Sequence, residues 1–451
     1  MKVPTTRLIA DLRGSARLAT DATAGLTDLV EAMHARIARL PGGQTAPDGR
    51  TGGITGLVYK TVRGITRLAG GSVDALLMLL TTALTPAANN DTAALHEAEL
   101  PSAERQALVA ALNGVFGDHL LASANPLAIE MALLDDSGRA LKLDAAALRQ
   151  SLPQAGPRLL VLVHGLCMSS WAAPKANSGA LRREGDPVTR WAAPEANSGA
   201  LRREDGPMSP LQLRRASSAG AASDHGRLLA EHAGWTPLYL LYNSGLHIAE
   251  NGRQLAALMQ RLLDAWPLPV ERLALLTHSM GGLVARSAVQ QASAAGMSWP
   301  ARLGDLVFLG TPHHGAPLER AGHGLDLLLG ATPYAAPLAR LGRTRSAGIT
   351  DLRHGSLSEG DAAGALPLHV PLPDGVRCWA IAATTGARRG GLKDRLLGDG
   401  LVPVASALGR HRDPARTLAI TADRQCVIDA THHLQLLSSP KVAERLLQWL
   451  R

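Results

Sequence analysis

From residue 127 onward, two apolar patterns alternate along the chain. Short continuous apolar runs are separated by segments in which apolar residues recur at the helical period. The runs are Leu159–Val163, Leu238–Tyr242, Leu273–Leu276, Leu306–Leu309 and Trp379–Ala383. Strands that are buried on both faces have this composition, and helices between such strands imply a parallel sheet. The alternation therefore predicts an α/β fold for residues 126–451.

A hairpin pattern precedes these runs. Residues 127–133 alternate between apolar and other side chains, and Asp135–Gly138 has the composition of a tight turn. Ala140–Leu143 then predicts a second strand. An antiparallel hairpin followed by strand–helix–strand units predicts an α/β sandwich with a mainly parallel sheet.

Residues 1–125 have a helical pattern and predict an N-terminal helical extension. Its apolar stripes include Leu26, Leu29, Val30, Met33 and Ile37, and later Val58, Val62, Ile65 and Leu68. One interpretation is a helical layer that packs on the main domain. The other is a surface that docks on lipid, because Lys60, Arg63 and Arg67 lie beside the second stripe. The sequence leaves both open.

A tandem duplication interrupts the α/β pattern. Trp171–Glu184 reads WAAPKANSGALRRE, and Trp191–Glu204 repeats it with Glu195 in place of Lys175. Two copies are too few to build a solenoid. Because residues 169–223 are rich in Ala, Arg, Gly, Pro and Ser, we expect a mostly disordered insertion in a surface loop. A flap over the functional site is the alternative.

Charge and cysteine usage exclude several classes of protein. The net charge is +8, but the basic residues are scattered, so no nucleic-acid-binding stripe is expected. Three cysteines without C-x-x-C spacing indicate neither a disulfide framework nor a structural zinc site. Asp11 lies where a signal peptide needs an apolar run, and Val73–Leu84 is too short to span a bilayer. We expect a soluble, cytoplasmic protein.

Ser279 lies between a predicted buried strand and a predicted helix. The segment reads LALLTHSMGGLVAR over residues 273–286. A sharp strand–turn–helix bend at this point would lift the serine hydroxyl clear of the sheet, as in a nucleophile elbow. Gly281 supplies one of the two small residues that the bend requires, whereas Thr277 stands where the other glycine is usual. The pattern predicts Ser279 as a nucleophile.

Two backbone N–H groups are placed to bind a developing oxyanion beside this serine. Met280 opens the helix, where unpaired N–H groups favour negative charge. The second donor must come from a loop after an earlier strand, and His164–Leu166 provides one. Gly165 allows the backbone to approach closely, so we expect the N–H of Leu166 to point inward.

A serine nucleophile needs a base and a carboxylate, which follow it in the order Ser, Asp, His in this type of fold. Asp399, between two glycines after the last long apolar run, is the candidate acid, and Asp394 is the weaker competitor. His432 and His433 precede the terminal helix, and the local pattern does not choose between them. We interpret His313 and His314 as pocket walls rather than metal ligands, and His278 as a packing or hydrogen-bonding neighbour of Ser279.

With these residues assembled, the chain resembles the lipase- and esterase-like branch of the α/β-hydrolase superfamily, including bacterial lipases and the GPI inositol-deacylase type. The matching motifs are VLVHGL at 161–166, THSMGGLVAR at 277–286, FLGTPHHGAPL at 308–318, GDGLVPVASA at 398–407 and HLQLL at 433–437. The resemblance implies a catalytic triad of Ser279, Asp399 and His433. It also implies an oxyanion hole formed by Leu166 and Met280. It also implies a cap or lid at about 320–365, and residues 1–125 match nothing in the common core.

The expected function is therefore hydrolysis of a carboxylic ester with an apolar acyl group, through an acyl-serine and without a metal or organic cofactor. One alternative is an acyltransferase or thioesterase, because these enzymes use the same triad. The other alternative is a lipid- or granule-surface binding protein in which the N-terminal helices matter and the hydrolase domain is secondary or inactive.

Overall fold

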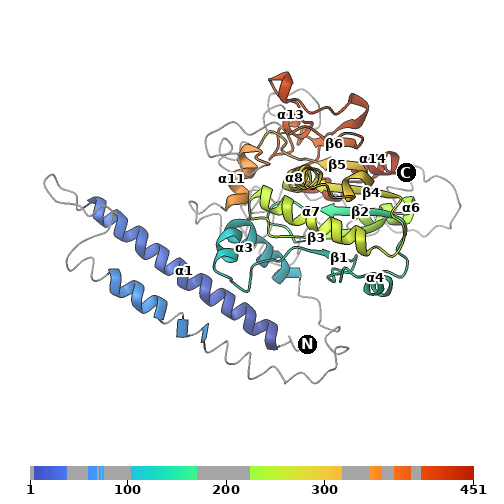
Figure 1. Cartoon of the computed structure of the whole chain (residues 1–451). Helices are drawn as coiled ribbons and strands as arrows, with labels where there is room; N and C mark the ends of the chain where they lie inside the picture. Colours follow the sequence, from blue (N-terminus) through green and yellow to red (C-terminus); the bar gives the residue numbers. More distant parts are fainter. Residues whose placement is uncertain are drawn as a thin grey trace, which may run out of the picture. The chain divides into compact units, whose positions relative to one another are not determined.

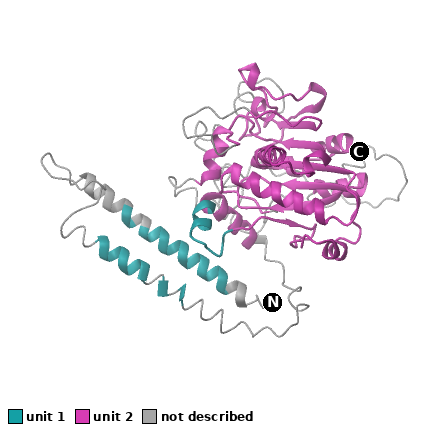
Figure 2. Cartoon of the chain, viewed as in Figure 1, with its two compact units in different colours: residues 1–102, 117–128 teal, residues 103–116, 129–451 magenta. Residues whose placement is uncertain are grey.

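The computed structural model describes residues 5–37, 59–68, 71–72, 74–75, 103–169, 224–316, 346–357, 370–386 and 398–451. The predicted insertion, apart from Ser169, and the predicted cap, apart from residues 346–357, lie outside the described residues. The chain divides into two compact units (Figure 2). One comprises Met1–Ser102 and Gly117–Ala128, and the other comprises Ala103–Phe116 and Ile129–Arg451.

A seven-stranded sheet forms the centre of the second unit, in the order β1-β3-β2-β4-β5-β6-β7 (Figure 1). The strands are β1 Ala132–Leu134, β2 Arg158–Val163, β3 Thr236–Leu241, β4 Arg272–His278, β5 Leu303–Leu309, β6 Arg377–Ala383 and β7 Gln425–Ile428. Only β1 runs antiparallel to its neighbour, β3, and all other pairs are parallel. The predicted α/β sandwich with a mainly parallel sheet is confirmed.

The predicted hairpin is shorter than expected. β1 pairs along its length with β3, whereas the second predicted strand contributes a single bridge, between Leu134 and Ala140. The chain turns away because Asp144 caps helix α4 (Ala145–Ser151), its carboxylate accepting the N–H groups of Ala146 and Ala147. Helix initiation therefore cuts the second strand short.

Helices cover both faces of the sheet (Figure 1). The remaining helices of this unit are α6 His225–Ala233, α7 Ile248–Ala265, α8 Met280–Ala294, α11 Ala347–His354, α13 Val404–Ala407 and α14 Pro440–Trp449, with 3-10 turns η3 Trp299–Arg302, η4 Pro414–Arg416, η5 Ala422–Arg424 and η6 His433–Leu437. In β2, Leu159, Val161 and Val163 pack with α7 and α8, while Leu160 and Leu162 pack with α6 and α14. Successive side chains thus enter opposite cores, which explains the uninterrupted apolar runs.

The unit at the N-terminus contains α1 (Thr5–Ile37) and a helix at residues 59–68. Asp74 accepts hydrogen bonds from both Arg13 and Arg17 of α1, and the Asn125 amide donates to the carbonyl of Gly14. α3 (Ala103–Ala122) kinks at Phe116, and its two parts belong to different units. Within the described residues, no helix is long and apolar enough to cross a membrane.

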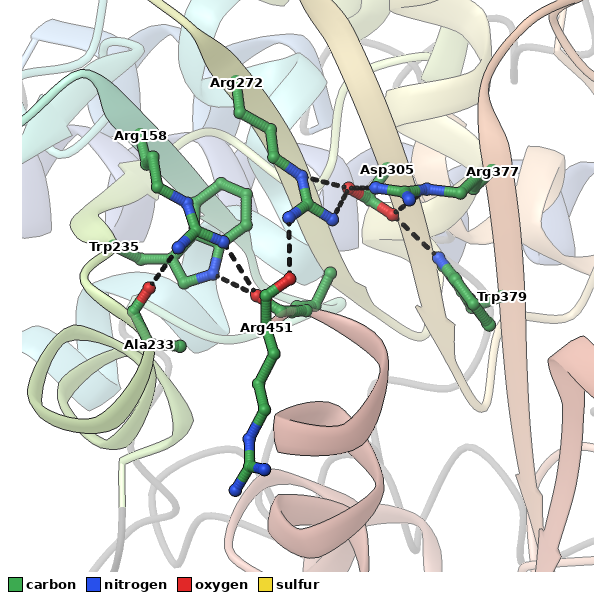
Figure 3. A network of polar contacts seen from close by, with 9 residues as sticks. Arg158, Ala233, Trp235, Arg272, Asp305, Arg377, Trp379 and Arg451 are labelled. Carbon is green, nitrogen blue, oxygen red and sulfur yellow. Dashed lines mark hydrogen bonds and ion pairs between the residues drawn. The ribbon is translucent and has the colours of Figure 1, made fainter. Parts of the chain in front are cut away.

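A buried carboxylate ties together the amino-terminal ends of three strands (Figure 3). Asp305 of β5 is fully buried and accepts hydrogen bonds from Arg272 of β4 and from Arg377 and Trp379 of β6. A buried carboxylate requires such charged, hydrogen-bonded partners, because removal from water strongly disfavours its ionised form.

Aromatic and backbone contacts extend this arrangement to β2 (Figure 3). The guanidinium groups of Arg158 and Arg272 lie over the ring of Trp235, 4.5 and 5.1 Å from its centroid. Arg158 and the Trp235 indole both donate to the carbonyl of Leu450, which anchors the segment after α14. The edge of the sheet with Asp305 is thus fixed by interactions between distant parts of the chain.

Replacing Asp305 with Asn should lower the free energy of unfolding by about 2–4 kcal/mol, because Arg272 and Arg377 would lose their shared carboxylate. The lower part of that range reflects the partial exposure of both arginines. Urea unfolding measures the effect. The same change at the exposed Asp374 should alter stability by less than about 0.5 kcal/mol; equal effects at the two positions would contradict the assignment.

Candidate active site

Ser279 occupies the bend that the sequence predicted. β4 ends at His278, α8 begins at Met280, and Ser279 between them has φ 54° and ψ −126°. A positive φ is strained for a residue with a side chain. A Cβ atom placed on Gly281 would lie 2.5 Å from the carbonyl oxygens of both Val163 and His164. Only glycine fits at position 281, which explains why one of the two small residues expected around the serine is present.

Thr277 is accommodated at the other position because it still belongs to the strand. It lies in β4, where extended geometry suits a β-branched residue. Its hydroxyl donates to the carbonyl of Val307 in β5, at 2.8 Å. The departure from glycine therefore adds an interstrand hydrogen bond rather than disturbing the bend.

Asp399 and His433 form a buried pair. The Nδ1 of His433 lies 2.7 Å from Oδ2 of Asp399, and the residues are 2% and 0% exposed. The other carboxylate oxygen accepts the N–H groups of Leu401 and Val402, so Asp399 is held in one orientation. Of the two neighbouring histidines, His433 is the one in contact with Asp399; Asp394, the weaker competitor, lies outside the described residues.

The serine lies at the same edge of the sheet as this pair. Its N–H donates to the carbonyl of Leu309, and a Cβ placed on the next residue, Gly310, would lie 3.1 Å from both His433 Cε1 and Asp399 Oδ2. Within the described part of the chain, Nε2 of His433 has no hydrogen-bond partner. In unliganded enzymes the contact between base and nucleophile is often long and tightens with substrate.

The two predicted oxyanion donors flank the serine. A Cβ placed on Gly165 would lie 3.0 Å from Cβ of Ser279, so the loop after β2 touches the bend. Leu166 and Met280 are both buried. Neither backbone N–H donates a hydrogen bond to another described residue. Met280 is also the first residue of α8, where the helix dipole favours negative charge.

The loop that carries Leu166 is supported by α3, which the sequence analysis did not connect with the site. Cys167 has φ 59°, and its N–H donates to Oγ of Ser244 at 3.0 Å. A Cβ placed on Gly114 of α3 would lie 2.1 Å from the Cys167 sulfur. Ser346 Oγ donates to the carbonyl of Gly114 at 2.7 Å. The glycine in an otherwise apolar helical pattern was the only signal of this close approach.

Two further histidines hold the segment that carries His433. Nε2 of His278 donates to the carbonyl of His433 at 3.1 Å, and Nε2 of His225 donates to that of Leu436 at 2.8 Å. Because a carbonyl only accepts, both rings carry their proton on Nε2. Burial lowers the pKa of both, that of His278 well below its ordinary value. η6 is thus pinned by neutral imidazoles from β4 and α6.

The predicted wall histidines, His313 and His314, lie in the loop after β5, and a buried arginine of α8 contacts this loop. The Arg286 guanidinium donates to Nδ1 of His313 at 3.3 Å and to the carbonyl of Val370, and burial lowers its pKa to about 10. Nε2 of His314 donates to the carbonyl of Gly409. The described residues include no group of three His, Cys, Asp or Glu side chains that could hold a metal ion.

The contact between α3 and the Leu166 loop is testable with one methyl group. Elsewhere in a helix, changing glycine to alanine stabilises by about 1 kcal/mol. Gly114→Ala should instead push Cys167 away and lower kcat for an ester about ten- to a hundredfold, with KM little changed. Cys167→Ala in the same chain should restore part of the loss. Gly156→Ala, whose Cβ would meet its nearest atom at 3.7 Å, is the control; full activity of Gly114→Ala would refute the role.

Stability should depend on pH through the buried histidines. Burial lowers the pKa of His164 to about 4, whereas an unfolded histidine titrates near 6.5. As pH falls from about 6.5 to 4, the unfolded chain gains a proton that the folded chain refuses. The free energy of unfolding therefore falls, by up to about 1.4 kcal/mol per pH unit at each such group. Urea unfolding at several pH values should show a shallower slope for His164→Asn and an unchanged slope for exposed His354→Gln.

Comparison with known proteins finds a family model that is similar to part of the chain. Residues 244–350 match the model of the PGAP1-like alpha/beta domain. A search of curated protein sequences gives no match.

Solved structures with similarity to this chain include three hydrolases. The mature lipase BlEst2 of Bacillus licheniformis is 17% identical, with TM-score 0.37 over 65% of this chain and 91% of that one. Phospholipase PlaB of Legionella pneumophila is 16% identical, with TM-score 0.36 over 66% and 60%. The metagenomic carboxyl esterase MGS0156 is 16% identical, with TM-score 0.35 over 79% and 97%. The family-model match, over a segment that includes Ser279, and the order of the strands confirm the expected resemblance to α/β hydrolases.

Proposed function

We propose that this protein is a serine hydrolase of carboxylic esters, of esterase or lipase type. The observation that carries the proposal is the buried pair of His433 and Asp399, 2.7 Å apart, at the same sheet edge as a strained serine at a helix N-terminus. An imidazole fixed by a carboxylate is a general base, and a serine in this bend is the group that such a base activates.

In the proposed first step, Nε2 of His433 takes the proton of the Ser279 hydroxyl as Oγ attacks the ester carbonyl. The free Nε2 suits this role, because Asp399 engages Nδ1 and so fixes the tautomer that leaves Nε2 as the base. The tetrahedral intermediate collapses when the imidazolium returns its proton to the leaving alcohol. An acyl-serine remains.

In the second step, water attacks the acyl-serine, and His433 again takes and returns the proton, so that the carboxylic acid leaves and Ser279 is regenerated. The N–H groups of Leu166 and Met280 bind the oxyanion in both steps. Each such donor contributes about a hundred- to a thousandfold in rate. Asp399 stabilises the imidazolium while it exists, because its carboxylate is fully buried and is held in place by two N–H groups.

The residues next to the serine favour one chemical type of acyl group in the substrate. Leu166 and Met280 are apolar side chains beside the serine, and both are buried. An apolar acyl chain fits such surroundings better than a charged one. Because an alcohol can also resolve an acyl-serine, product analysis with competing alcohols distinguishes a hydrolase from an acyltransferase. Comparison of thioester with oxygen-ester substrates distinguishes a thioesterase, in which the thiol is the leaving group.

Ser279→Ala should abolish labelling by a fluorophosphonate and lower kcat for p-nitrophenyl esters by about four to six orders of magnitude. Ser293→Ala, an exposed serine on the same helix, should leave both unchanged. In the same assay His433→Asn should be inactive and His432→Asn active, because His433 contacts Asp399. Labelling that persists without Ser279 would exclude it as the nucleophile.

A further inference from the structure

The helix at residues 59–68 turns its apolar side chains outward. Val62, Ile65 and Leu68 are 41%, 64% and 75% exposed, whereas Arg63 is 8% exposed. A helix on the surface of a soluble protein normally shows the reverse, with apolar residues inward and charged residues outward. Three residues apart, the exposed apolar side chains follow one side of the helix as a stripe.

Arg63 points inward because its partner lies in α1. Its guanidinium forms an ion pair with Asp28, with 2.9 Å between Nη1 and Oδ1. The sequence analysis grouped Arg63 with Lys60 and Arg67 as cations beside the apolar stripe, and the structure separates it from them. The ion pair holds Arg63 on the side of the helix that faces α1, and the apolar stripe faces solvent.

Two cations remain beside the stripe. Lys60 and Arg67 are exposed and, seven residues apart, lie on the same side of the helix. Neither forms an ion pair within the described chain. An exposed apolar stripe bordered by exposed cations is the arrangement of helices that lie in the interface of a membrane, where the apolar side chains enter the acyl region and the cations meet headgroups.

We propose that Val62, Ile65 and Leu68, together with Lys60 and Arg67, form a docking surface for a lipid bilayer with anionic headgroups. Charge complementarity selects this partner. Lys60 and Arg67 are exposed, and anionic headgroups attract the cations that border the stripe. A second copy of the chain would instead bring cations of the same sign toward the same stripe. The inference does not rest on ester hydrolysis, because none of these residues belongs to the active site.

Flotation of the full-length protein with vesicles tests the proposal. The vesicles contain phosphatidylcholine alone or phosphatidylcholine with phosphatidylglycerol. Ile65→Ser with Leu68→Ser should weaken binding to the anionic vesicles about tenfold or more, because two apolar side chains no longer enter the bilayer. Lys60→Glu with Arg67→Glu should remove the preference for phosphatidylglycerol, and high salt should mimic that change for the wild type.

Matched controls lie in the other unit of the chain. Leu268→Ser removes an apolar side chain that is 45% exposed, and Arg302→Glu with Arg412→Glu reverses two exposed cations. Both variants should bind as the wild type does. Turnover of a soluble short-chain ester and fluorophosphonate labelling should be unchanged in every variant, so that failure of the docking proposal is distinguishable from failure of the proposed function.

The proposal is overturned if the wild type does not float with anionic vesicles, or if Ile65→Ser with Leu68→Ser binds as well as the wild type. Sedimentation velocity without lipid tests the alternative that a second copy of the chain binds to the stripe. If the wild type self-associates and the serine variant becomes monomeric while its vesicle binding is unchanged, the stripe is an interface between copies and not a lipid surface.

Discussion

Burial of the central sheet on both faces is the constraint on which the second unit depends. Side chains along β2, β4 and β5 alternate between two apolar cores, so polar groups are confined mainly to the strand ends. The amino-terminal edge has Asp305 with its arginine and tryptophan partners. The opposite edge has Ser279, Asp399 and His433. The contacts of Asp305 fix the positions of the strands relative to one another. The positions of Ser279, Asp399 and His433 at the opposite edge depend on that arrangement of the strands.

At the edge with Ser279, described backbone segments approach one another closely. Gly281 lies against the carbonyls that end β2, and Gly114 lies against Cys167. η6 is fastened by His225 and His278 through its backbone carbonyls. These contacts would serve the proposed function, because a base that acts on a serine must be held within a few tenths of an ångström, and small displacements are costly in rate.

Local chemistry decides how much the sequence could predict. The bend at Ser279 depends on residues within a few positions of it, so the sequence could predict the strand, the glycine and the helix together. Asp399 and His433 were placed by chain order and by family resemblance, because a local pattern cannot tell His433 from His432. The Gly114–Cys167 and His225–Leu436 contacts join residues far apart in the chain, and no periodicity reports such pairs. Arg63 was misplaced because its partner, Asp28, belongs to another helix.

The burial of Cys167 has a practical consequence for labelling chemistry. Removal from water raises the pKa of the Cys167 thiol, and that of the Cys378 thiol, to about 12. Thiolates are the species that react with maleimides and oxidants, so these two sulfurs should stay inert while the fold is intact. Cys426, which is partly exposed, then offers a single natural attachment point for a spectroscopic probe, on the last strand of the sheet.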